Sequence, residues 1–163
     1  MLDTVGAVLA PKAAMPPCDK RIGELYRYWL SRWPAPDLLP GRQHCSPSDI
    51  PDLLPWVWLA DVHRNPLRFK YRLVGTACVE ATGSETTGRW LDEVHPDFRA
   101  SALHSHFEAV AERAQVSHYR GRPLYISAIY EARKWKTLER LILPLARDGL
   151  NVDMLFCLTT FEK

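Results

Sequence analysis

Four histidines in the second half of the chain are the side chains best suited to hold a metal or a haem iron. They are His95, His104, His106 and His118. His104 and His106 are two positions apart in a predicted helix, so they point about 200° apart and cannot chelate one ion. His104 borders that helix's apolar stripe and is the better candidate to reach the interior. A lone helix histidine is usually a boundary residue, so we expect no haem.

Four cysteines are the next candidates for metal or redox chemistry. Cys18, Cys45, Cys78 and Cys157 are far apart and form no CxxC pair. A tetrahedral zinc site normally includes at least one close pair of ligands. We therefore expect reduced thiols, no metal site and no disulfide.

Carboxylates around one predicted helix could serve acid–base chemistry. Asp92 and Glu93 precede the helix, and Asp97, Glu108 and Glu112 lie on or near it. A carboxylate near a helix start suits capping better than catalysis. The chain has neither a nucleophile elbow nor a phosphate-binding glycine loop. We expect no catalytic residues.

Composition and charge indicate a soluble globular protein. Of its 163 residues, 47% are hydrophobic and 25% charged, and six are tryptophan. The net charge of +2 is too balanced for the basic surface of a nucleic-acid-binding protein. No apolar run approaches the roughly 20 residues of a membrane helix, and residues 1–10 lack the cationic start of a secretory signal. We expect a cytoplasmic protein that binds no nucleic acid and does not insert into membranes.

The pattern of prolines and apolar residues divides the chain into four segments. Residues 1–19 lack periodicity and are expected to form a flexible arm. Residues 20–34 form an amphipathic helix, which Asp19 caps. Residues 35–55 are rich in proline and are interpreted as a connector packed on the domain. Residues 56–163 form the core domain.

The core domain begins with two strands and ends with three. The first pair is a hairpin over 56–62 and 68–74, followed by short helices to residue 93 and a longer helix over 97–114. The last strands are expected within 117–130, 134–145 and 152–161. This order predicts an α+β fold with one five-stranded antiparallel sheet and short helices on one face.

Several stretches in these segments are similar to a family of small bacterial proteins that consist of a single PAS domain. The similarity spans roughly residues 20–162 and implies the PAS fold. After Arg42 the family often has acidic residues where this chain has His44 and Ser46. The matching stretches are 25–29, 42, 47, 49–55, 61–62, 69–76, 83, 87–89, 138–141, 143–145 and 149.

The resemblance implies sensing and regulation, but it brings no agreed ligand and no catalytic residues. In PAS domains, flavin photochemistry would place a cysteine among the short helices, within an Asn/Gln-rich loop. Cys78 lies in that region without such a loop, so we expect no flavin and interpret Cys78 as a buried structural thiol.

One face of the predicted sheet is the candidate ligand cavity. Alternation places Phe69, Tyr71 and Leu73 on that face and Arg72 on the other. A filled core explains the same residues equally well. The candidate lining is Phe69, Tyr71, Leu73, Trp90, Leu103, His104, Phe107, Tyr125 and Leu141.

The apolar stripe of the first helix is the candidate partner surface. It carries Leu25, Tyr26, Trp29 and Trp33. The stripe can cover its own sheet or pack on a second copy in a homodimer, an arrangement that the PAS resemblance implies.

Three functions remain open from the sequence. The leading one is a non-catalytic sensory module that binds a small ligand or a signalling protein and shifts between two packings of the sheet and the first helix. The second is a protein-interaction adaptor with a filled core. The third is a small hydratase- or isomerase-like enzyme, which would need two titratable groups within hydrogen-bond reach in the interior.

Overall fold

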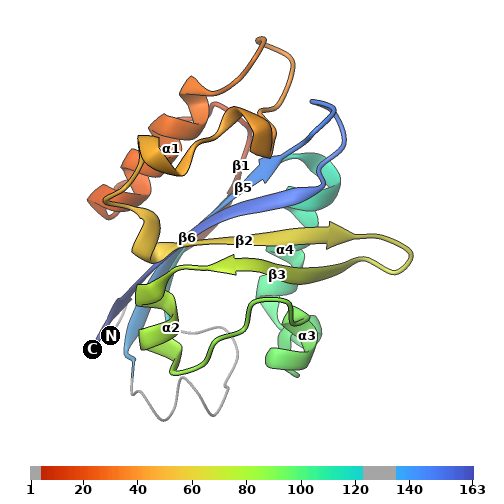
Figure 1. Ribbon diagram of the computed structural model, residues 1–163. Coiled ribbons are helices and arrows are strands. Elements are labelled where there is room, and N and C mark those ends of the chain that lie inside the picture. The colour runs from red at the N-terminus through yellow and green to blue at the C-terminus, as the bar shows by residue number, and fades with distance from the viewer. Residues whose placement is uncertain (1–4, 123–134) are drawn as a thin grey trace.

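The structure is a computed structural model that describes residues 5–122 and 135–163. These residues contain an antiparallel sheet of six strands (Figure 1). The strand order is β1-β4-β5-β6-β2-β3. The strands are β1 Val5–Leu9, β2 Val57–His63, β3 Arg68–Val74, β4 Val116–Gly121, β5 Thr137–Leu145 and β6 Met154–Glu162.

Helices cover both faces of this sheet (Figure 1). Helix α1, Lys20–Ser31, lies on one face, while α2, Thr76–Thr82, α3, Leu91–Val94, and α4, Ala102–Arg113, lie on the other. None of the described helices is long and apolar enough to cross a membrane. The predicted α+β class is confirmed. Single 3₁₀ turns lie at Arg42–His44, Pro47–Asp49, Leu54–Trp56 and Phe98–Ala100.

Helix α1 forms where its pattern predicts. The Asp19 carboxylate caps it by accepting a hydrogen bond from the Arg21 backbone N–H at 2.8 Å. The helix ends at Ser31, three residues before Pro34. Pro34 limits its extension, because the residue directly before a proline avoids the helical region. The indole Nε1 of Trp29 donates to the Pro144 carbonyl of β5 at 3.0 Å.

The predicted flexible arm is wrong in part, because it contains a strand. Val5–Leu9 forms β1 and pairs antiparallel with β4, from Val5 opposite Arg120 to Leu9 opposite Val116. This strand is the sixth, where the sequence predicted five. The short run VGAVL has too little alternation to signal a strand, and the free edge of β4 supplies the pairing partner.

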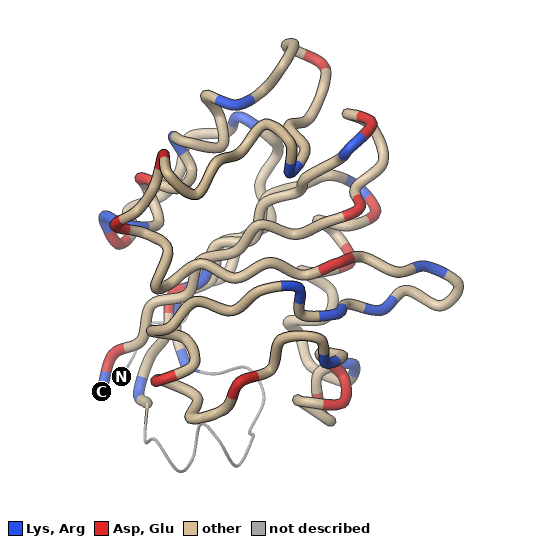
Figure 2. The backbone as a smooth tube through the Cα atoms, viewed as in Figure 1, with Lys and Arg blue, Asp and Glu red and all other residues tan. Residues whose placement is uncertain are grey.

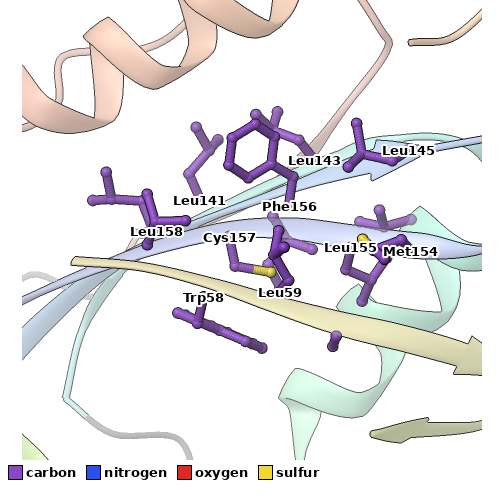
Figure 3. Packing of buried hydrophobic residues seen from close by; sticks show 14 of the residues in the cluster. Trp58, Leu59, Leu141, Leu143, Leu145, Met154, Leu155, Phe156, Cys157 and Leu158 are labelled. Carbon is purple, nitrogen blue, oxygen red and sulfur yellow. The ribbon is translucent and has the colours of Figure 1, made fainter. Parts of the chain in front are cut away.

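The strands β5 and β6 form the centre of the core and are buried along most of their length. Neighbouring side chains of a strand point to opposite faces. Leu141, Leu143 and Phe156 therefore lie on the side of α1, whereas Trp58 of β2 lies on the opposite side (Figure 3). All four are buried.

The hairpin of β2 and β3 contains an irregularity that changes which residues share a face. Leu59 pairs with Leu73 and Ala60 pairs with Tyr71, so Arg72 is an extra residue in β3. Such a β-bulge reverses the alternation beyond it. Tyr71 and Leu73 consequently face opposite sides of the sheet.

Candidate ligand cavity

A cavity of about 40 Å³ lies between the sheet and the helices α2 to α4. One water molecule needs roughly 10–15 Å³ of such space, so the cavity has room for about three. Its sheet wall includes Trp58, Tyr71, Arg140, Thr159 and Phe161, and its helical wall includes Cys78, Leu91, Val94, His95, Leu103 and Phe107.

Aromatic rings fill the interior beside this cavity. The rings of Phe69 and Phe98 each meet the ring of Phe107 edge-on, with centroids 5.2 and 5.0 Å away. Trp58 stacks on Phe107 at 6.1 Å. Edge-to-face packing at these separations is favourable, so this cluster fixes one wall of the cavity.

Tyr71 and His95 place two polar groups in the cavity wall. The Tyr71 hydroxyl and His95 Nε2 are 3.1 Å apart, within hydrogen-bond distance. Burial lowers the pKa of His95 to about 4, and the positive charges of Arg140 and Arg89 add to this effect. The imidazole is therefore neutral at physiological pH.

Arg140 brings a permanent positive charge into the same wall. It is 5% exposed and belongs to the middle of β5. Its register partner on β6 is Thr159, whose hydroxyl accepts a hydrogen bond from Trp58 Nε1 at 2.9 Å. A guanidinium stays protonated when buried, so the cavity combines a cation with neutral hydrogen-bonding groups.

The comparisons with known proteins agree with this architecture. A family model described as PAS domain matches residues 19–159. The chain belongs to the PAS domain family. PAS domains are generally sensory or regulatory modules, and this chain belongs to that general class. A search of curated proteins gave no match.

One solved structure shares the PAS fold of this chain. It is the structure of an RNA-binding Light-Oxygen-Voltage receptor, with a TM-score of 0.52 and 14% sequence identity. The match covers 98% of this chain and 39% of the receptor. At that identity the likeness shows the fold alone, and RNA binding is a property of the receptor.

The PAS cavity, as the described residues line it, is small beside the larger cofactors that the sequence raised. A flavin or haem needs space of the size of ordinary ligand pockets, about 300 Å³ or more, and this cavity has about 40 Å³. Cys78 Sγ donates to the Trp56 carbonyl at 3.4 Å, and burial raises the pKa of this thiol to about 12. Among the described residues no group of three or more His, Cys, Asp or Glu side chains is placed to hold a metal ion.

Two predicted cavity residues lie on the wrong face of the PAS sheet. The bulge at Arg72 turns Leu73 away from the cavity, and the Leu73 residue is 45% exposed. Leu141 is fully buried but lies on the α1 side of β5, because its neighbour Arg140 faces the cavity. Tyr71, Leu103 and Phe107 line the cavity.

Three other predicted cavity residues, all described by the structure, lie outside the lining. Phe69 is buried in the ring cluster beside it. Trp90, at the start of α3, packs against the β2–β3 hairpin, with the Arg68 guanidinium 4.1 Å from its ring centroid. His104 Nδ1 lies 3.5 Å from a Glu108 oxygen, at the edge of α4. Tyr125 is outside the described residues.

The predicted partner stripe is used inside the PAS domain itself. Leu25 and Trp29 are 0% exposed, Tyr26 is 5% exposed, and Trp33 is half-buried. Of the two roles that the sequence left open, the stripe covers its own sheet. A homodimer would need a different surface.

The polar residues that line the cavity were not identified from the sequence. His95 appeared only as one of four histidines, and Arg140 and Thr159 were not candidates. A signal for Arg140 does exist: Glu139 and Arg140 interrupt the apolar run of β5, and neighbouring residues of a central strand point to opposite buried faces. Two adjacent charges in such a strand indicate a polar site on each side.

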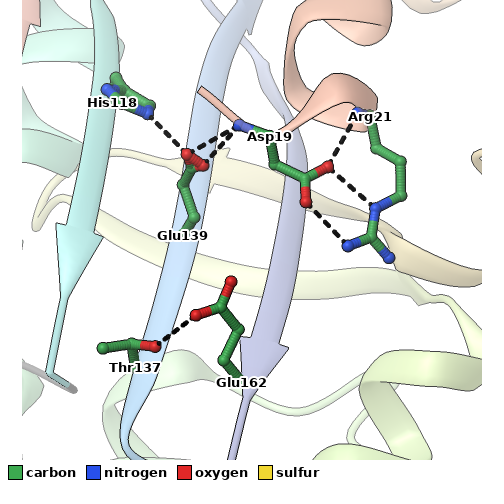
Figure 4. Close-up of polar contacts among 6 residues, drawn as sticks. All are labelled: Asp19, Arg21, His118, Thr137, Glu139 and Glu162. Carbon is green, nitrogen blue, oxygen red and sulfur yellow. Dashed lines mark hydrogen bonds and ion pairs between the residues drawn. The ribbon is translucent and has the colours of Figure 1, made fainter. Parts of the chain in front are cut away.

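The polar site on the α1 side belongs to Glu139 (Figure 4). Both carboxylate oxygens accept from the Asp19 backbone N–H, at 3.0 and 2.9 Å, at the N-cap of α1. His118 Nε2 of β4 lies 3.5 Å from the same carboxylate. Glu139 is 5% exposed, so this contact ties the start of α1 to the middle of the sheet.

Proposed function

We propose that this PAS domain is a sensory module whose inner cavity binds a small carboxylate. The observation that carries the proposal is the convergence of Tyr71, His95 and Arg140 on one small interior space. A guanidinium presents N–H groups in a planar fork that matches a carboxylate, and the neutral His95 and Tyr71 can complete its hydrogen bonding.

The size of the cavity limits the ligand to a few heavy atoms. About 40 Å³ holds about three waters, which corresponds to formate or acetate without rearrangement of the walls. The ligand would displace water from around Arg140, so its charge would interact with the guanidinium in a medium of low dielectric constant.

Signalling would use the adjacent residues of β5. Arg140 faces the cavity, while Glu139 holds the first turn of α1 through the Asp19 backbone. A ligand that draws Arg140 would change the position of β5 and with it the packing of α1. This is the two-packing mechanism, with the ligand favouring one packing by its differential affinity.

A protein-interaction adaptor with a filled core is the second candidate. It is favoured by the small volume of the cavity, because three waters can also fill that space permanently. On this account the domain would bind its partner through its surface and give no response to small carboxylates.

The domain is proposed to be non-catalytic. Tyr71 and His95 are the pair of titratable interior groups that an enzyme would need. However, a general base works best with a pKa near the working pH, and burial lowers the pKa of His95 to about 4. Such a histidine is a weak base at neutral pH.

We also propose that the domain does not bind nucleic acid. The β2–β3 hairpin carries several basic residues (Figure 2), and two of them pair with acidic side chains. Arg72 pairs with Asp61 at 3.0 Å, and Arg68 pairs with Asp92 at 2.7 Å. These carboxylates offset the charge that phosphates would otherwise meet.

A titration with formate and acetate tests the ligand proposal. The indole Nε1–H of Trp58 donates to Thr159 at the cavity wall, so its NMR resonance in the ¹⁵N-labelled protein reports on the cavity. We expect this resonance to shift saturably with either ligand, while the indole resonance of Trp90, which lies outside the cavity lining, stays in place.

Two variants make this test specific. Arg140→Gln should abolish the Trp58 shift, whereas Arg147→Gln at an exposed turn should leave it unchanged. If Arg140→Gln does not fold, Val94→Phe, which adds a ring at the helical wall, should abolish the shift instead. An unchanged Trp58 resonance in the wild-type protein would overturn the ligand proposal and favour the adaptor.

A further inference from the structure

A second pocket, of about 180 Å³, lies on the opposite face of the sheet from the inner cavity. The connector before β2 forms one wall and the outer face of the sheet forms the other. We call this space the outer pocket. Its walls are mainly aliphatic and aromatic, chiefly Ile50, Leu54, Val57, Leu59, Leu145 and Phe156.

The β-bulge at Arg72 supplies the edge of the outer pocket. It turns Leu73 to this face, where the side chain lines the pocket and the residue is 45% exposed. Exposure of a leucine at the mouth of an apolar pocket leaves an entrance from solvent. A ligand bound there would cover apolar surface that water now contacts.

Among the described residues that line the outer pocket, only Arg42 carries a charge. One of its nitrogens, Nη1, donates to the Cys45 carbonyl at 2.7 Å. Within the described part of the chain, no carboxylate oxygen lies within 4.0 Å of the Arg42 guanidinium. The nearby Asp49 carboxylate accepts from the Tyr28 hydroxyl at 2.8 Å. The pocket therefore offers an apolar interior and a cation that can still pair with an anion.

The volume of the outer pocket sets the size of its occupant. A dry apolar cavity of about 150 Å³ is large enough to bind benzene. A pocket of about 180 Å³ therefore suits an alkyl chain of about six to eight carbons. The inner cavity, at about 40 Å³, is too small for such a chain.

We propose that the outer pocket binds a free medium-chain carboxylate. The alkyl chain would lie between Leu54 and Phe156, and the carboxylate would pair with Arg42 at the rim. This site is separate from the inner cavity and its ligand. It would let the domain respond to an amphiphile at the connector that joins α1 to the sheet.

Calorimetric titration of the full chain with sodium octanoate tests the proposal. We expect saturable binding that weakens about fourfold for each methylene removed, through heptanoate to hexanoate, because each buried methylene contributes a similar free energy. Octanol has the same chain without the charge and should bind about two- to fivefold more weakly, which is the range of an exposed ion pair.

Matched variants separate the two parts of the site. Leu73→Asp places a negative charge at the entrance and should abolish octanoate binding, whereas Leu150→Asp, at a leucine that is 68% exposed elsewhere, should not change it. Arg42→Gln should weaken octanoate about two- to fivefold and leave octanol unchanged. Arg147→Gln is the control for the loss of a positive charge. Leu73 and Arg42 are both exposed, so these variants should fold.

Three results would overturn the proposal. They are the absence of saturable heat up to about 10 mM octanoate, an affinity independent of chain length, and equal binding by wild-type and Leu73→Asp protein. Equal octanoate affinity in the wild-type and Arg42→Gln proteins would show that the carboxylate does not pair with Arg42. Arg140→Gln should leave octanoate binding intact, so failure of the inner cavity and failure of the outer pocket are distinguishable.

Discussion

Glu139 and Arg140 are neighbours on β5, and they serve opposite faces of the sheet. Glu139 accepts the backbone N–H of Asp19 at the start of α1, and Arg140 lines the inner cavity. Burying a carboxylate and a guanidinium is costly unless each meets complementary groups. Their position in the most buried strand is the residue-scale basis for coupling the cavity to the helix.

The buried histidine of the cavity makes stability depend on pH. Burial lowers the pKa of His95 to about 4 in the folded protein, against about 6.5 in the unfolded chain. Between these values the unfolded chain binds a proton that the folded protein does not, so acid favours unfolding. Urea unfolding should show a loss of about 2 kcal/mol from this residue between about pH 7.5 and pH 5.

The His95→Gln variant isolates this contribution, because the carboxylates titrate in both proteins. Its free energy of unfolding should fall by about 2 kcal/mol less than that of the wild type over the same range. Equal losses in the two proteins would show that His95 is already protonated, or exposed, in the folded state.

Residue types alone predicted His104 rather than His95 as the interior histidine. His104 borders the apolar stripe of α4, but its imidazole turns to Glu108. His95 follows α3, a helix of four residues, where no periodicity shows which way a side chain points. The contact with Tyr71 depends on the path of the chain between β3 and α3, which the sequence pattern does not specify.

At the scale of elements, the alternation of apolar and charged residues predicted which face of the sheet the β3 side chains meet, up to the bulge. Phe69 and Tyr71 face the helices as expected, and the extra residue Arg72 then turns Leu73 to the other face. Nothing in the run Arg68–Val74 marks the bulge, because no glycine or proline interrupts it. Because of this one extra residue, Leu73 lines the outer pocket and not the inner cavity.

Helix α1 is expected to be part of the folding unit. Trp29 is fully buried and donates to the Pro144 carbonyl, so Trp29→Ala should lower the free energy of unfolding by about 3–5 kcal/mol. Arg27→Ala, on the exposed side of the same helix, should change it by less than about 0.5 kcal/mol. Chemical denaturation measures both. A stable Trp29→Ala protein that loses only a binding partner would restore the stripe as a docking surface.

At the scale of the whole molecule, the order of helices and strands predicted the α+β class and the antiparallel sheet, except for β1. Paired strands at both ends of the core, with helices between them, close into one antiparallel sheet in few ways. The cavities were not predictable in the same manner. Their volumes depend on how the rings of Phe69, Phe98 and Phe107 pack, and a ring can fill or vacate such a space without any change in pattern.

We expect a ligand at Arg140 to change the packing of α1 through Glu139. The indole N–H groups of Trp58 at the cavity and of Trp29 in α1 report on the two sites in one NMR titration with formate. We expect both resonances to shift with the same apparent affinity in the wild type, and only that of Trp58 to shift in Glu139→Gln. A Trp58 shift without any Trp29 response in the wild-type protein would contradict the account.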